Sequence, residues 1–124
     1  MHDELKLIKA LADGNRLRVV AALSRYQELC ACQITELLQV SGATTSRHLA
    51  ILQDAGLASS RKDGRWVYFS LSRPKGSASL FQWLNQSLSS SETWHSDTET
   101  LKLIMAMTPE DLCRRQRGEV CCPA

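Results

Sequence analysis

The periodicity of apolar residues changes at Gly56, and this change restricts the possible folds of the chain most. Before Gly56, apolar residues recur at helical spacing, and polar turn residues divide the segment into four short helices. After it, two strand-like runs at 57–61 and 66–71 flank Asp63-Gly64, a pair typical of a β-hairpin turn. Helical spacing returns at about 77–88. The pattern predicts a mainly α fold with one β-hairpin.

The expected helices fall into one domain and a short C-terminal extension. A chain of 124 residues is enough for one modest core and too short for two. We expect a domain over 1–92, followed over 93–124 by a C-terminal helix and a flexible tail that contains cysteines. The predicted helices, about five to six in all, lie near 5–12, 15–23, 32–39, 44–54, 77–88 and 99–107.

Charge and composition exclude several classes of protein. The net charge of +2 excludes a strongly basic arm but permits a local basic patch. No apolar run approaches the roughly 18 residues of a membrane span. The acidic opening is unlike a secretory signal, so we expect a cytoplasmic protein. In that compartment five cysteines indicate reduced thiols and metal or redox chemistry.

Residues 32–54 match the pattern of a helix-turn-helix. Its second helix begins with hydroxyl side chains, an arginine and a histidine, which suit contacts with base edges and phosphates in a major groove. The hairpin places three basic residues at or beside its tip, where a wing contacts phosphates or the minor groove. The alternative is an ordinary small α+β domain without a DNA role. The candidate DNA-binding residues are Thr44, Thr45, Ser46, Arg47, His48, Arg61, Lys62 and Arg65.

Four segments carry a more specific resemblance. They are 11–18 (LADGNRLR), 46–52 (SRHLAIL), 55–57 (AGL) and 64–69 (GRWVYF). Over about residues 4–90 the chain resembles the ArsR/SmtB family of winged-helix repressors. The resemblance implies a winged helix-turn-helix homodimer, joined by its first and fifth helices, that binds a palindromic double-stranded DNA operator and releases it when an inducer binds. The apolar stripes of those two helices fit either a dimer interface or a core: Leu5, Ile8, Leu11, Leu80, Trp83 and Leu84.

Cys30 and Cys32 form a Cys-x-Cys pair within 28–34 (ELCACQI). Two thiolates at this spacing are a short chelate for soft, thiophilic ions. The segment resembles the box ELCVCDL at the start of the third helix in arsenic-sensing members, which implies trivalent arsenic or antimony as inducer. On an ideal helix the two side chains point about 200° apart. Both can face one ion only if Cys30 precedes the helix or the first turn deforms. We expect the helix N-terminus to lower their pKa values.

The third sulfur that trivalent arsenic or antimony prefers is not fixed by the sequence. Arsenic-sensing boxes often carry it three residues after the second cysteine, where this chain has Thr35. It can come from Cys113, Cys121 or Cys122 or from a small cellular thiol, or be absent. Two thiolates suffice for methylarsenite, whose third bond is to carbon. The other interpretation is that a cysteine of the pair is simply a small buried apolar residue.

The predicted function is a repressor released from its operator by arsenite, antimonite or methylarsenite bound to Cys30 and Cys32, without a permanently bound cofactor. An alternative is a repressor that senses thiol redox state or reactive sulfur through the same cysteines. A more distant one is a thiol-based metal(loid) carrier with no DNA role. An enzyme is not expected, because no histidine and carboxylate flank Cys30 in sequence. The three histidines are too scattered for a zinc site.

Overall fold

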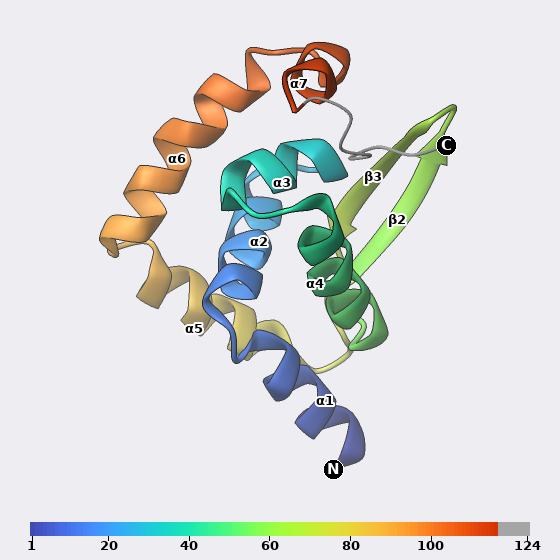
Figure 1. Cartoon of the computed structure of the whole chain (residues 1–124). Helices are drawn as coiled ribbons and strands as arrows, with labels where there is room; N and C mark the ends of the chain where they lie inside the picture. Colours follow the sequence, from blue (N-terminus) through green and yellow to red (C-terminus); the bar gives the residue numbers. More distant parts are fainter. Residues whose placement is uncertain (117–124) are drawn as a thin grey trace.

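Helix α3 (Ala31–Leu38) packs against four other helices and the sheet, while the first and fifth helices of the chain lie farther from it (Figure 1). The computed structural model describes residues 1–116, and of residues 113–115 it describes the backbone alone. Within that range the chain forms seven helices and a three-stranded antiparallel sheet. In chain order these are α1 (His2–Leu11), α2 (Gly14–Arg25), β1 (Leu29–Cys30), α3 (Ala31–Leu38), α4 (Gly42–Asp54), β2 (Ala58–Asp63), β3 (Trp66–Leu71), α5 (Ala78–Leu88), α6 (Glu92–Met105) and α7 (Pro109–Arg115).

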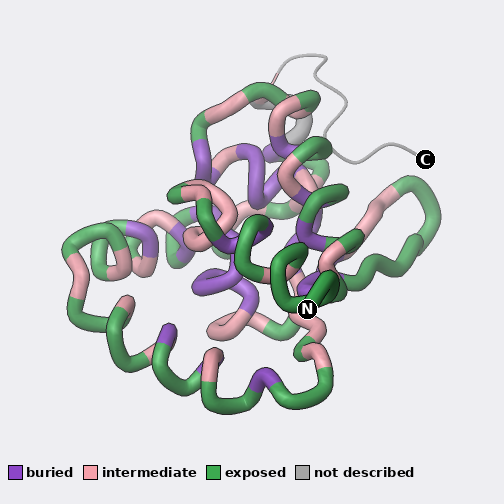
Figure 2. Tube along the Cα trace, turned by 90° about the horizontal axis from the view of Figure 1, so that it is seen from below, coloured by how far each residue is buried: buried purple, intermediate pink, exposed green. Residues whose placement is uncertain are grey.

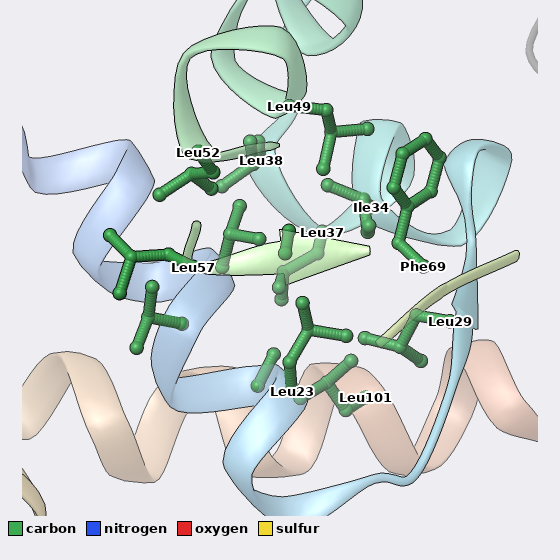
Figure 3. Close-up of a cluster of buried hydrophobic side chains, with 14 of the residues drawn as sticks. Leu23, Leu29, Ile34, Leu37, Leu38, Leu49, Leu52, Leu57, Phe69 and Leu101 are labelled. Atoms are coloured by element: carbon green, nitrogen blue, oxygen red, sulfur yellow. The ribbon is translucent and has the colours of Figure 1, made fainter. Parts of the chain in front are cut away.

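The core is a cluster of apolar side chains where α2, α3 and α4 meet the sheet (Figure 3). Ile34 of α3 and Leu49 and Leu52 of α4 are buried in it, because each helix turns one apolar stripe inward. Leu101 of α6 reaches the same cluster. Burying a side chain of this size contributes about 1.5–3 kcal/mol. The cluster therefore fixes α4 against α3, as a helix-turn-helix requires.

The sheet has the strand order β1-β3-β2. Its first strand has two residues and was not predicted from the sequence, since so short a segment has no detectable alternation. Leu29 pairs with Phe69, and Cys30 pairs with Tyr68. The strand thus attaches the start of α3 to the hairpin.

The hairpin of β2 and β3 is the predicted wing, and it projects from the body of the molecule (Figure 1). Asp63 pairs with Trp66, which leaves Gly64 and Arg65 as a two-residue turn. Gly64 has a φ of 63°, in the left-handed region that glycine adopts without steric cost. The predicted fold class, a mainly α winged helix-turn-helix, is confirmed.

Helix α6 begins seven residues earlier than the helix predicted at 99–107. The Ser91 side chain caps it by accepting a hydrogen bond from the backbone N–H of Trp94 at 3.1 Å. His95, which falls between the helices predicted at 77–88 and 99–107, therefore lies in a helix. The polar first turns concealed the helix because only a narrow stripe is buried. That stripe includes Asp97, which accepts two hydrogen bonds of 2.9 Å from the guanidinium of Arg18 on α2.

Helices α1 and α5 leave large apolar side chains exposed. Leu5 is 48% exposed, Ile8 59% and Trp83 61%, whereas Leu11 and Leu84 are buried in the core. Figure 2 shows this contrast between a buried centre and largely exposed outer helices. In residues 1–116 no helix is both long and apolar enough to pass through a bilayer.

Candidate nucleic-acid interface and thiol site

Helix α4 begins at an exposed cap and buries one side against α3. The Ser41 side chain accepts a hydrogen bond from the backbone N–H of Thr44 at 3.1 Å. The cap satisfies one of the donors that a helix start leaves open. Leu49 and Leu52 are buried toward α3, so the opposite side of α4 faces outward.

The five predicted residues of α4 divide between its two sides. Four of them reach solvent. Ser46 and Arg47 are exposed, and Thr44 and His48 are half-buried. Thr45 differs, because it is 1% exposed and its hydroxyl lies against α3. It stands four residues before Leu49, which places it in the buried stripe. Thr45 was predicted to contact DNA, but its side chain is not on the outer surface, and the spacing to Leu49 was the feature that indicated this.

Thr45 is hydrogen-bonded to Thr35 of α3. Thr35 stands at the position where arsenic-sensing boxes carry their third cysteine. The hydroxyl of Thr35 lies 2.9 Å from that of Thr45, and both residues are buried. Thr45 Oγ1 in turn donates to the carbonyl of Ser41 at 3.2 Å. A chain of hydrogen bonds therefore runs from the middle of α3 to the cap of α4.

His48 connects α4 to the junction of α1 and α2. Its Nδ1 lies 3.1 Å from Arg16 Nη1 and accepts this hydrogen bond, because a guanidinium can only donate. Arg16 Nε also donates to the carbonyl of Ala10 at 2.6 Å. This contact holds one side of the His48 ring against the protein.

The three predicted basic residues of the wing are exposed but differ in their partners. The guanidinium of Arg61 donates two hydrogen bonds to Glu28, at 2.6 and 2.8 Å, and stacks on Tyr68. The Arg61 hydrogen bond lowers the pKa of the Glu28 carboxyl. Lys62 makes no ion pair within the described residues, and Arg65 stacks on a neighbouring ring. Lys62 and Arg65 are thus the wing's more available cations.

Cys30 and Cys32 bring their sulfur atoms together at the start of α3. The two Sγ atoms are 2.9 Å apart, and both residues are fully buried. Cys30 precedes the helix as its N-cap, with an extended backbone of φ −74° and ψ 152°. The extended residue lets both sulfurs lie on one side, which an ideal helix does not permit. At bond lengths of about 2.3 Å, one thiophilic ion can bond both.

The Cys30 side chain also caps α3. It accepts the backbone N–H of Gln33, and the Cys30 backbone N–H donates to Gln33 Oε1 at 2.7 Å. Burial raises the pKa of the Cys32 thiol to about 11. The expected lowering by the helix N-terminus was wrong for Cys32, because removal from water outweighs the nearby backbone donors.

Helix α7 lies beside the thiol pair and was missed in the tail. Its start has a Thr-Pro-Glu-Asp sequence, and Thr108 Oγ1 accepts the backbone N–H of Asp111 at 3.1 Å. Threonine at the cap, proline in the first turn and early acidic residues are typical helix starts. The Cys32 Sγ lies 4.0 Å from the Pro109 carbonyl, and Gln116 Nε2 donates to the Cys32 carbonyl at 3.2 Å.

The other candidate ligands are not placed by the structure. Cys121 and Cys122 lie outside the described residues, and so does the side chain of Cys113. Among the side chains that are described, no three His, Cys, Asp or Glu residues gather as a metal site.

A helix-turn-helix on a buried support, followed by a basic hairpin, defines the winged helix-turn-helix class of DNA-binding regulators. Residues 13–60 match the family described as "Bacterial regulatory protein, arsR family". Over 119 residues the chain is 33% identical to the arsenical resistance operon repressor of Escherichia coli K12, covering 94% of each chain. This chain belongs to the ArsR family, whose members are transcriptional regulators, and it is not an enzyme.

Further relatives agree with this assignment. Over 69 residues the chain is 42% identical to the "Cadmium resistance transcriptional regulatory protein CadC homolog" of Staphylococcus aureus, covering 56% of this chain and 57% of that one. Among solved structures, HlyU from Vibrio cholerae has a TM-score of 0.62 and 28% identity, over 69% of this chain and 91% of HlyU.

Proposed function

We propose that this protein is a homodimeric repressor that leaves a palindromic DNA operator when trivalent arsenic or antimony binds Cys30 and Cys32. The inducers in question are arsenite, antimonite and methylarsenite. The observation that carries the proposal is the pair of sulfur atoms 2.9 Å apart at the start of α3. The names of the Escherichia coli and Staphylococcus aureus relatives support a metal or metalloid as inducer.

The outer side of α4 and the tip of the wing form the proposed DNA surface. Arg47 is exposed near the start of α4, where it can pair with a guanine in the major groove. Lys62 and Arg65 lie at the hairpin tip and neutralise phosphates. In this account Thr45 supports the surface from inside, and Arg61 contributes less because Glu28 holds it.

The cap of α3 explains how an occupied site affects this surface. An inducer bonded to the Cys30 sulfur competes with the Gln33 backbone N–H that this sulfur accepts. Loss of a helix cap costs about 1 kcal/mol. A shift of α3 then reaches α4 through Thr35 and Thr45, whose hydroxyls are 2.9 Å apart. The first turn of α4 then no longer lies where it can contact DNA.

Dimerisation is proposed through α1 and α5. Their exposed apolar residues, Leu5, Ile8 and Trp83, are the kind of surface that a second copy covers. Two copies related by a twofold axis then present two reading helices to a palindromic site, spaced by about 34–36 Å or a multiple of it.

A second candidate inducer is an oxidant, because Cys30 is disulfide-bonded in the structure and the buried Cys32 thiol lies 2.9 Å from its sulfur. Oxidation of two thiols by hydrogen peroxide forms one disulfide bond and two water molecules. This reaction uses the same two residues, so substitution of the cysteines alone does not separate it from metalloid binding.

A titration of operator release separates the candidates. Fluorescent operator DNA bound to the protein is titrated with arsenite, antimonite, methylarsenite, cadmium, zinc and peroxide. We expect release by the arsenic and antimony compounds under reducing conditions, and no release from Cys30→Ser or Cys32→Ser proteins that still bind operator. If both variants still release DNA in arsenite, the pair is not the inducer site. Release by peroxide alone favours the redox candidate.

A further inference from the structure

Arg16, in the first turn of α2, connects the end of α1 to α4. Its Nε donates to the Ala10 carbonyl at 2.6 Å, and its Nη2 donates to the Lys9 carbonyl at 3.4 Å. Both carbonyls belong to the last turn of α1, where the helix dipole favours a positive charge. The remaining nitrogen, Nη1, donates to His48 Nδ1 at 3.1 Å. Each nitrogen of the guanidinium therefore has an acceptor within the protein.

The hydrogen bond from Arg16 determines which nitrogen of the His48 ring carries the proton. Because a guanidinium can only donate, Nδ1 accepts, and the proton of the neutral ring lies on Nε2. The two ring nitrogens flank one carbon and their bonds diverge, so Nε2–H points away from Arg16. Within residues 1–116 no protein group is hydrogen-bonded to Nε2, and the residue is half-buried. His48 thus offers one N–H donor whose direction Arg16 fixes.

The place of His48 on α4 favours a phosphate as the acceptor. Ser46 and Arg47 occupy the exposed side of the helix, whereas His48 lies at its flank, against the junction of α1 and α2. A helix in the major groove turns its outer residues to base edges, while its flanks lie along the sugar-phosphate backbone. An N–H donor at the flank therefore meets phosphate oxygens.

We propose that Arg16 is a positioning residue for DNA binding, which orients the His48 ring so that Nε2–H donates to a phosphate oxygen of the duplex. This inference rests on the proposed function, because it assigns a contact within the proposed DNA surface. Since Arg16 also binds the last turn of α1, it links this donor to a helix of the proposed dimer interface. A neutral imidazole does not neutralise the phosphate, so this contact, unlike that of Lys62, leaves the salt dependence of affinity unchanged.

The first test compares two substitutions of His48. The amide nitrogen of glutamine reaches about the place of Nε2, whereas that of asparagine lies near the place of Nδ1. We expect His48→Gln to bind operator DNA within about twofold of wild type, and His48→Asn to bind it roughly three- to tenfold more weakly. The same loss is expected at low salt on a duplex of scrambled sequence, because phosphates carry no sequence information. The slope of log affinity against log salt should not change.

The second test addresses the positioning role through Arg16→Met. We expect the same loss as for His48→Asn, no further loss in Arg16→Met/His48→Asn, and an unchanged salt slope. Nitrogen NMR of the imidazole should show protonation at Nε2 alone in the wild type and exchange between both nitrogens in Arg16→Met. The matched control is Lys6→Met, which also removes a positive charge and a contact between α1 and α4, since Lys6 Nζ lies 3.3 Å from Asp54. We expect it to bind within about twofold of wild type.

Each other result has a separate meaning. Wild-type affinity of His48→Asn, or a loss on operator DNA alone, overturns the phosphate contact. A wild-type ring protonated at Nδ1, or additive losses in the double variant, overturns the positioning role. A salt slope reduced by about one in Arg16→Met means that Arg16 itself contacts a phosphate, which also overturns it.

Two controls keep these outcomes distinct. An equal loss in Lys6→Met makes the effect one of charge or helix attachment and contradicts the proposal. The His48 variants and the wild-type NMR spectrum leave Arg16 in place, so they test the proposal even when Arg16→Met does not fold. Failure of the proposed function itself appears elsewhere, as wild-type operator affinity of Arg47→Ala.

Discussion

The starts of α3 and α4 are both capped by the side chain of the preceding residue, yet they lie in opposite environments. Cys30, the cap of α3, is fully buried beside Cys32, whereas Ser41, the cap of α4, is exposed. The first has sulfur in a dry site, and the second has hydroxyls and an arginine in water. The two starts are connected by the hydrogen bond between Thr35 and Thr45. The comparison teaches that, in the proposed mechanism, an inducer bound at the start of α3 acts on the proposed DNA surface through this buried connection.

The largest expected effect is on operator affinity, from a substitution at the exposed start of α4. Arg47→Ala removes the arginine best placed to pair with a base, and one such contact is worth about 1–3 kcal/mol. We expect operator affinity to fall by roughly 10- to 100-fold, with the stability of the fold unchanged. Arg47→Lys is the matched control, because it keeps the charge and loses the bidentate geometry. Wild-type affinity of Arg47→Ala, measured by anisotropy at moderate salt, would show that α4 is not the reading helix.

The next prediction compares two neighbouring residues of α4. Thr45→Val removes the hydrogen bond between the Thr35 and Thr45 hydroxyls, while Thr35 keeps the Ala31 carbonyl as a partner, and we expect a loss of about 0.5–1.5 kcal/mol in the free energy of unfolding. Ser46→Ala, on the exposed side, should change that free energy by less than about 0.5 kcal/mol. Chemical denaturation measures both. Equal effects from the two substitutions would contradict the division of α4 into a buried and an exposed side.

The buried thiol should appear in the pH dependence of stability. The pKa of Cys32 is raised from an ordinary value of 9.0 to about 11, so the folded chain holds this proton more tightly than the unfolded chain. Its contribution is complete below about pH 9 and is lost as the pH rises toward 11. The slope for one group is at most about 1.4 kcal/mol per pH unit. Denaturation of wild type and Cys32→Ser at several pH values isolates this contribution. Parallel curves across that range would mean that the thiol is not buried.

The smallest effects belong to the wing, where each phosphate contact acts through salt-dependent attraction. Lys62→Ala and Arg65→Ala should each reduce the slope of log affinity against log salt by about one. Arg61→Ala should reduce it less, because Glu28 already neutralises that arginine. Glu28→Gln, which frees Arg61, should make this slope steeper. Equal slopes for the Arg61 and Lys62 variants would show that the ion pair opens on DNA.

Periodicity and turn chemistry were enough to predict the core fold. The apolar stripes of α2 to α4 and the Asp63-Gly64 turn are local patterns, and each formed where it was expected. Helix α7 escaped detection because seven residues are too few to show a stripe, although its Thr108-Pro109 start was readable. The two-residue strand β1 is defined by pairing with Tyr68, which no local pattern reveals.

The residue types of the site could be predicted from the sequence, whereas their burial and their partners could be predicted less well. Sequence indicated the Cys-x-Cys pair and two ways in which both sulfurs can face one ion: Cys30 precedes the helix, or the first turn deforms. In the structure Cys30 precedes the helix. Burial was not visible in the sequence, so the direction of the Cys32 pKa shift was wrong. The pairing of Arg61 with Glu28 joins residues 33 positions apart, and only the fold brings them together.

Hydrogen exchange measures the central claim most directly, that an inducer at the start of α3 acts on α4 through the core. Arsenite is added to the operator-free protein, and amide exchange is followed at Gln33, whose N–H the Cys30 side chain accepts, and in the first turn of α4. We predict faster exchange at both places in the wild type and at neither in Cys32→Ser. Operator release by arsenite with unchanged exchange at both places would contradict the account.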